Sequence, residues 1–174
     1  MKKLLVILPL GLCLAGCPMD GYLGQPSAGT AAAPSTPMNL TTFLSRLESA
    51  RGTALTTAEK TAVGGAVQQT RSLLDGGQQR FIGAVSQVSG LDPATLGILF
   101  PPATQPVSQT DVVAKLESKA GRKLGGIESQ AAKAAASLRN NSLASLKTNL
   151  AGRVAKEVGM DAAFVEGLLP LLGF

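Results

Sequence analysis

The sequence contains no histidine and no tryptophan, and aromatic residues make up only 3% of it. Without histidine the chain lacks the commonest general base and the commonest neutral metal ligand, which excludes histidine-based catalysis and metal sites. The core must therefore be built from Leu, Val, Ile and Ala, within an apolar content of 45%. Because Ala has the best helix propensity of all residues, this composition favours helices.

Cysteine and net charge are also limited. Cys13 and Cys17 are the two cysteines, and both lie near the N-terminus, so no disulfide framework is expected beyond them. Removal of Lys2 and Lys3 with a leading segment would leave 14 basic and 11 acidic residues, a net charge of +3. This balance, together with the shortage of aromatic side chains, disfavours nucleic acid as a partner.

The N-terminus has the pattern of an export signal. Two lysines precede an apolar run over residues 4–14, which ends in Ala15-Gly16-Cys17. Residues 14–17, Leu-Ala-Gly-Cys, resemble the bacterial lipobox. The resemblance implies that 1–16 is a cleaved signal peptide and that Cys17 carries a thioether-linked lipid and an N-acyl chain such as palmitate. Several acyl chains anchor a protein firmly where one does so only marginally. A plain secretory signal with an incidental cysteine is the alternative.

The predicted location follows from this signal. We expect a protein of the bacterial cell envelope, anchored by its lipid. Pro18, rather than Asp, follows Cys17. In the Gram-negative sorting pattern this favours the outer membrane, with the domain facing the periplasm. Residues 17–38 are rich in Pro, Gly, Ser, Thr and Ala, which predicts a disordered tether with a reach of about 25 Å.

The remaining domain, 39–174, contains an internal repeat. Segment 41–101 aligns with segment 110–170 without a gap, which places LESARGTAL over LESKAGRKL. Matches recur at Gly, Pro and apolar positions, which control folding. We interpret this as a tandem duplication, joined by a proline-containing linker over 102–109.

Each copy is predicted to form a helix, a long helix and a short helix. In the first copy these cover about 41–51, 57–89 and 94–100, with a capping box at Thr56 and Glu59. Gly76-Gly77 leaves open a break in the long helix. The predicted fold is an all-α helical bundle in which the two copies pack around a pseudo-two-fold axis, with antiparallel long helices. One copy alone would be marginally stable.

No catalytic constellation is visible, and we expect no enzyme activity, no cofactor and no metal. The alternative is a metal site or an acid–base pair formed by carboxylates that the repeat doubles, Glu48 with Glu117 and Glu59 with Glu128. Each also has a structural role open to it. Glu59 and Glu128 lie in first helical turns, where anions are favoured, and Glu48 is expected to pair with Arg51.

Two clusters are candidates for binding. Lys119, Arg122 and Lys123 form the densest positive group, which either contacts an anionic lipid or other polyanion or is a solvated helix end. The C-terminal apolar residues Leu171, Leu172 and Phe174 either complete the core or contact a partner.

The preferred hypothesis is a non-enzymatic helical interaction or scaffold module, whose partners are the membrane and another envelope protein. One alternative is a carrier of an apolar ligand or lipid, held between the amphipathic copies. The other is a metal-dependent enzyme that uses the paired glutamates.

Overall fold

The computed structural model describes residues 39–174, and every regular element in this range is helical, which confirms the predicted all-α fold. The predicted signal peptide and tether lie outside the described residues. Six α-helices and a final 3-10 turn follow one another along the chain. They are α1 Leu40–Arg51, α2 Thr57–Ser89, α3 Pro93–Leu99, α4 Gln109–Ala120, α5 Gly126–Val158, α6 Ala162–Leu168 and η1 Leu169–Leu172.

Hydrogen bonds between near neighbours fix the helix ends. At the start of α2 the Thr56 hydroxyl accepts from the Glu59 amide at 3.2 Å, and the Glu59 carboxylate accepts from the Thr56 amide at 2.6 Å. This confirms the predicted capping box. At the start of α5 only the carboxylate half is present, because Gly125 has no side chain; its amide donates to Glu128 at 2.7 Å. Gly52 ends α1 with a φ of +75°, a left-handed conformation that is unfavourable for residues other than glycine.

The long helix α2 runs without a break through Gly76 and Gly77. Two glycines in a helix interior cost about 1 kcal/mol each relative to alanine. On either side of them, Leu74 and Phe81 are buried, with exposed fractions of 4% and 3%. Burial of these large side chains offsets the glycine cost, so the open question of a break is settled in favour of one continuous helix.

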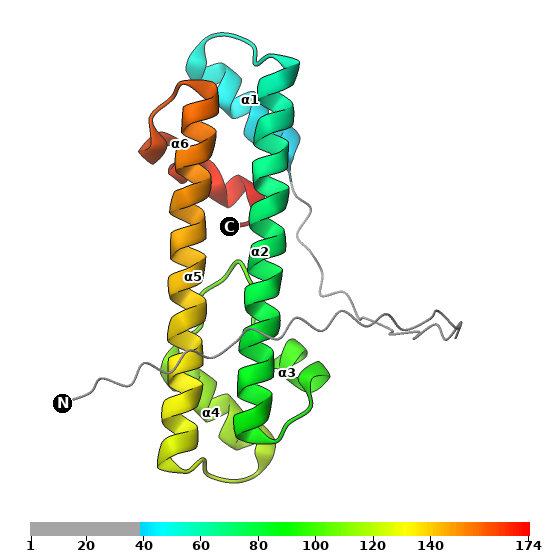
Figure 1. Cartoon of the computed structure of the whole chain (residues 1–174), viewed down its shortest axis with the longest axis vertical. Coiled ribbons are helices and arrows are strands. Elements are labelled where there is room, and N and C mark those ends of the chain that lie inside the picture. Colours follow the sequence, from blue (N-terminus) through cyan, green and yellow to red (C-terminus); the bar gives the residue numbers. More distant parts are fainter. Residues whose placement is uncertain (1–38) are drawn as a thin grey trace, which may run out of the picture. The chain divides into compact units, whose positions relative to one another are not determined.

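Helices α2 and α5 lie side by side and run in opposite directions, as predicted (Figure 1). The short helices gather at the two ends of this pair. At one end, α1, α6 and η1 contact one another beside the start of α2 and the end of α5. At the other end, α3 contacts α2 and α4 contacts α5. The first of these ends is therefore built from short helices that lie far apart in the sequence.

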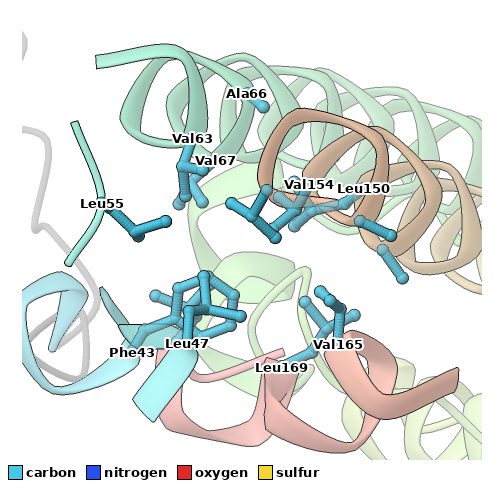
Figure 2. Close-up of a cluster of buried hydrophobic side chains, with 14 residues drawn as sticks. Phe43, Leu47, Leu55, Val63, Ala66, Val67, Leu150, Val154, Val165 and Leu169 are labelled. Atoms are coloured by element: carbon cyan, nitrogen blue, oxygen red, sulfur yellow. The ribbon is translucent and has the colours of Figure 1, made fainter. Parts of the chain in front are cut away.

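The first core fills the end that carries α1, α6 and η1 (Figure 2). Its side chains come from α1, the start of α2, the end of α5, α6, η1 and the loop after α1. The buried members are Phe43, Leu47, Leu55, Val63, Ala66, Val67, Leu150, Ala151, Val154, Ala155, Val158, Val165, Leu169 and Leu172. Aliphatic residues dominate this list, as the composition requires.

The second core fills the opposite end, with side chains from the end of α2, α3, α4, the start of α5 and the connecting loops. Its buried members are Phe81, Ile82, Val85, Leu96, Phe100, Val107, Val112, Leu116, Leu124, Ala132 and Ala136. Phe81 and Phe100 meet edge to face, with ring centroids 5.1 Å apart. Both cores take side chains from both halves of the chain, so neither half contains a complete core of its own.

Candidate functional site

Between the two cores the helix pair is less tightly packed. The buried hydrophobic residues there are Leu74, Ala103 and Leu143, and we call these three residues the central cluster. Beside it a groove of about 450 Å³ opens along α2 and α5, which we call the central groove. Its lining consists of Leu73, Leu74, Gly77, Gln78, Arg80, Ala103, Leu138, Arg139, Asn141, Ser142, Ser145 and Leu146. The volume lies within the range of about 300–1,000 Å³ that is typical of small-molecule sites.

Small residues leave this space open. Gly77, Ser142 and Ser145 stand where larger side chains would fill the gap between the helices. A Cβ added to Gly77 would meet no heavy atom within 4 Å, so the backbone there faces open space. The groove therefore results from the local sequence, while the helix pair on either side of it remains closely packed.

The walls of the central groove combine apolar surface with positive charge. Leu73 and Leu138 are exposed to 48% and 69%, and both line the groove, so they give it accessible apolar surface. Arg80 and Arg139 also line it, and no carboxylate does. Arg80 donates from Nε to the Gly76 carbonyl at 3.3 Å and forms no ion pair with a described carboxylate.

Arg139 is the least expected residue of the site, because it is a buried cation with an exposed fraction of 5%. Its guanidinium donates to Gln78 Oε1 at 2.6 Å and to the carbonyls of Gln105 at 2.8 Å, Pro101 at 3.0 Å and Pro102 at 2.8 Å. These acceptors are all neutral. Burial lowers the pKa of Arg139, but an arginine remains protonated at physiological pH. The buried charge thus fastens the 101–105 segment to the helix pair, and no carboxylate of residues 39–174 forms an ion pair with it.

Our sequence reasoning missed Arg139, although a signal was present. Ala132, Ala136, Arg139 and Leu143 follow one another at the three- and four-residue spacing that places them on one face of α5. A basic residue within such a buried stripe requires hydrogen-bond partners inside the fold. The loop carbonyls that provide them come from elsewhere in the sequence, so the spacing indicated the anomaly but not its partners.

The predicted basic cluster lies at the turn between α4 and α5, beside a shallow depression of about 430 Å³. Arg122 donates to both carboxylate oxygens of Glu128, at 2.8 and 2.9 Å. Lys123 pairs with Glu117 at 2.8 Å, and Lys119 is exposed. Two of the three positive charges therefore have carboxylate partners within the turn, which weakens the case for this cluster as a polyanion site.

The C-terminal residues do not form one exposed patch. Leu172 belongs to the first core with an exposed fraction of 1%, so our prediction that it contacts a partner is wrong; its side chain completes the core instead. Leu171 is 37% exposed. Phe174 is half-buried beside the first core and the central cluster, with its ring centroid 5.4 Å from the Arg71 guanidinium. Only Leu171 and part of Phe174 remain accessible.

The paired glutamates do not meet in space. Glu48 on α1 and Glu117 on α4 lie at opposite ends of the long-helix pair (Figure 1). Glu48 binds the Lys60 ammonium at 2.9 Å and the Leu55 amide at 3.0 Å. The expected pairing of Glu48 with Arg51 is wrong, because Arg51 reaches Glu59 at 2.6 Å instead. The loop after α1 brings these partners together, which residue spacing within one helix does not predict.

The second pair, Glu59 and Glu128, caps the starts of α2 and α5 and is separated in the same way. Within residues 39–174 no group of three or more acidic, cysteine or histidine side chains is close enough to hold a metal ion. The predicted lipidation site, Cys17, lies outside the described residues.

Comparison with known proteins identifies no relative of this chain. No protein-family model matches the chain, and neither a curated protein nor a solved structure shows significant similarity to it. Among the helices of residues 39–174, none combines the length and apolar character that crossing a membrane would require.

Proposed function

We propose that this protein is a lipid-anchored component of the bacterial cell envelope whose helical domain acts by binding rather than by catalysis. The anchor rests on the export signal and on the lipobox-like residues that end in Cys17. The binding role rests on one structural observation, the central groove. It places the exposed side chains of Leu73 and Leu138 in a single hollow of about 450 Å³.

The environment of the acidic residues supports binding over catalysis. The four glutamates that the repeat doubles are each engaged in a hydrogen bond to a backbone amide and in an ion pair. Their carboxylates are therefore held in structural contacts, and none of the four lines the central groove. A general acid or base needs to reach a substrate in a pocket. The interaction module is the better proposal, and the carrier of an apolar ligand is the second candidate, favoured by the volume of the same groove.

We also propose that the domain arose by tandem duplication and has a pseudo-two-fold axis. The sequence offset that places Leu40 on Gln109 also maps both bounds of α1, α2 and α3 onto those of α4, α5 and α6. Glu117 accepts from the Leu124 amide at 3.1 Å, which repeats the bond between the equivalent residues Glu48 and Leu55. Equivalent residues thus make equivalent contacts.

The position of the proposed axis follows from the cores. When the same offset is applied to the second core, nearly all of its members coincide with members of the first core. In this comparison α4 corresponds to α1, and α3 corresponds to α6. Leu74 and Leu143, which are equivalent under this offset, share the central cluster. A residue lies beside its own counterpart only near a two-fold axis. The central groove is therefore located close to the proposed axis.

A photocrosslinking pair tests the binding proposal in intact cells. The photoreactive amino acid p-benzoylphenylalanine replaces Leu138 in the groove, and in a matched strain it replaces Ile127, which is 85% exposed at the start of α5 and outside the groove. We expect a specific adduct from position 138 and none from position 127, with mass spectrometry to identify it. A protein adduct supports the interaction module, and a lipid adduct supports the carrier. Equal labelling from both positions would show that the groove has no binding role.

A further inference from the structure

The lining of the central groove carries a net positive charge. Its lining contains two arginines, Arg80 and Arg139, and no acidic residue. In the described part of the chain, neither arginine forms an ion pair with a carboxylate, whereas Arg51 and Arg122 each pair with a glutamate. A hollow lined by charges of one sign raises the local concentration of ions of the opposite sign. The lining therefore favours an anionic group over a neutral or cationic one.

Arg139 supplies a fixed part of this field. Its four observed hydrogen bonds go to neutral oxygens, which satisfy four of its five N–H donors without cancelling its charge. Arg80 supplies the accessible part. It is exposed, and only its Nε is bonded, to a carbonyl of its own helix. The forked end of its guanidinium is thus free of described partners and suited to a carboxylate, which it can bind with two parallel hydrogen bonds.

The apolar part of the lining extends away from Arg80. Because α2 and α5 are antiparallel and Leu74 shares a cluster with Leu143, Arg80 lies toward Leu138 and away from Leu146. Along α2, the stretch from Leu73 to Arg80 rises about 10 Å. The groove therefore offers one charged end and an apolar stretch of that length.

We propose that the central groove binds a medium-chain fatty acid, with its carboxylate at Arg80 and its acyl chain along Leu73, Leu74 and Leu146. The proposal rests on the binding role inferred above for the groove, takes it in its second form, the carrier of an apolar ligand, and names the ligand class. The carboxylate is held by the exposed guanidinium and by the field of Arg139. The chain covers the apolar walls and fills the space beside Gly77.

Photolabelling of the mature lipidated protein, in phosphatidylcholine vesicles, tests this inference. The probe is decanoate with a diazirine near its methyl end, and the labelled peptides are mapped by mass spectrometry. Gly77→Leu fills the groove, whereas Gly76→Leu is the matched control, since Gly76 is outside the lining and its added side chain also meets open space. We expect labelling of the groove peptides to persist in Gly76→Leu and to disappear in Gly77→Leu. Both variants should retain their helical circular dichroism.

Two further comparisons test the charge. Arg80→Gln should raise the decanoate concentration for half-maximal labelling by roughly tenfold or more, the effect of losing a charged hydrogen bond. Arg46→Gln, which removes an exposed arginine of α1, should leave the decanoate concentration for half-maximal labelling unchanged. Decanol with the same diazirine should label the wild-type groove more weakly than decanoate does. Equal labelling by decanol and decanoate would overturn the assignment of a carboxylate.

The outcomes separate this inference from the function on which it rests. If decanoate gives no groove-specific label while position 138 captures an envelope protein in cells, the fatty-acid assignment fails and the interaction module stands. If neither experiment labels the groove, both proposals fail.

Discussion

Arg139 donates a hydrogen bond from Nε to Oε1 of Gln78 at 2.6 Å, and this bond joins α5 to α2 beside the central groove. The same guanidinium holds three loop carbonyls. We expect Arg139→Ala to lower the free energy of unfolding by about 3 kcal/mol, because Gln78 and the three loop carbonyls lose a charged donor and the space left by the buried side chain is not refilled. Urea unfolding followed by circular dichroism measures this change.

Arg153→Ala provides the control for that experiment. Arg153 also joins the two long helices, through a 2.7 Å bond to Gln69, but both side chains are exposed. Its replacement should cost within about 0.5 kcal/mol, as is usual for surface substitutions. Similar losses in the two variants would show that burial of Arg139 has no special importance.

The capping glutamates predict a loss of stability in acid. Hydrogen bonds from the Thr56 amide, then from Arg51 and the Thr56 hydroxyl, lower the pKa of Glu59 to about 2; the Arg122 hydrogen bonds, then the Gly125 amide, lower that of Glu128 to about 2. Both pKa values lie below the ordinary value of 4.5. Their stabilising effect is therefore complete above pH 4.5 and is lost as the pH falls toward 2. The melting temperature measured across this range should fall accordingly.

NMR titration of the side-chain carboxyl carbons tests the contribution of Arg122 to the lowered pKa of Glu128. Arg122→Gln should raise the pKa of Glu128, while Lys119→Gln, which removes a charge from the same cluster without an observed partner, should not. If Glu128 titrates near 4.5 in the wild-type protein, the ion pair does not hold the carboxylate in solution.

Gly125 offers a stabilising substitution. It is the N-cap of α5 but lacks a side chain, and its φ of −63° is accessible to any residue. Gly125→Ser should complete the capping box and restrict the unfolded chain, which together should stabilise the domain by about 0.5–1 kcal/mol. Gly121→Ala is the contrasting variant. Its φ of +65° should make the added Cβ destabilising by about 1 kcal/mol. Denaturant unfolding of both variants checks the signs.

The proposed anchor predicts where lipid is attached. In cells fed an alkyne analogue of palmitate, the wild-type chain and Cys13→Ser should both become labelled, because Cys13 lies within the predicted signal peptide. Cys17→Ser should remain unlabelled. Label on the Cys17→Ser chain would contradict the lipobox interpretation.

Short-range features of the fold were predictable from the sequence. The bounds of α2 follow from the Thr56 cap and from Gly90, and the start of α3 from Asp92, because each depends on hydrogen bonds within a few residues. The continuity of α2 through Gly76 and Gly77 was left open, since it depends on burial of Leu74 and Phe81 against other helices.

Features that depend on distant segments were not predictable. The loop carbonyls that accept from Arg139 and the burial of Leu172 are set by which short helix packs at which end. The central groove likewise depends on how α2 and α5 align, because Leu73 and Leu138 belong to different halves of the chain and only the paired helices bring them together. Spacing within one helix carries no information about such contacts.

The mixed composition of the two cores leads to the most direct test of the architecture. The first core needs α1 from the first half of the chain and α6 and η1 from the second half. The second core needs α3 from the first half and α4 from the second half. A fragment of residues 39–105 therefore contains parts of both cores and the whole of neither. At this size a domain has little surface to bury even when its core is complete. We expect fragments 39–105 and 106–174 to be unfolded as monomers and to regain helical circular dichroism when mixed in equal amounts.

The control is the intact domain with a protease site inserted between Gln105 and Pro106. Cleavage there should leave the helices folded, because the cores do not depend on this bond. Sedimentation then gives the state of each fragment. A fragment that folds only as a dimer of itself fits the duplication, since two copies of one half can exchange their short helices as the two halves do. A fragment that folds as a stable monomer would contradict it, because the helices of one half would then bury one another without the second.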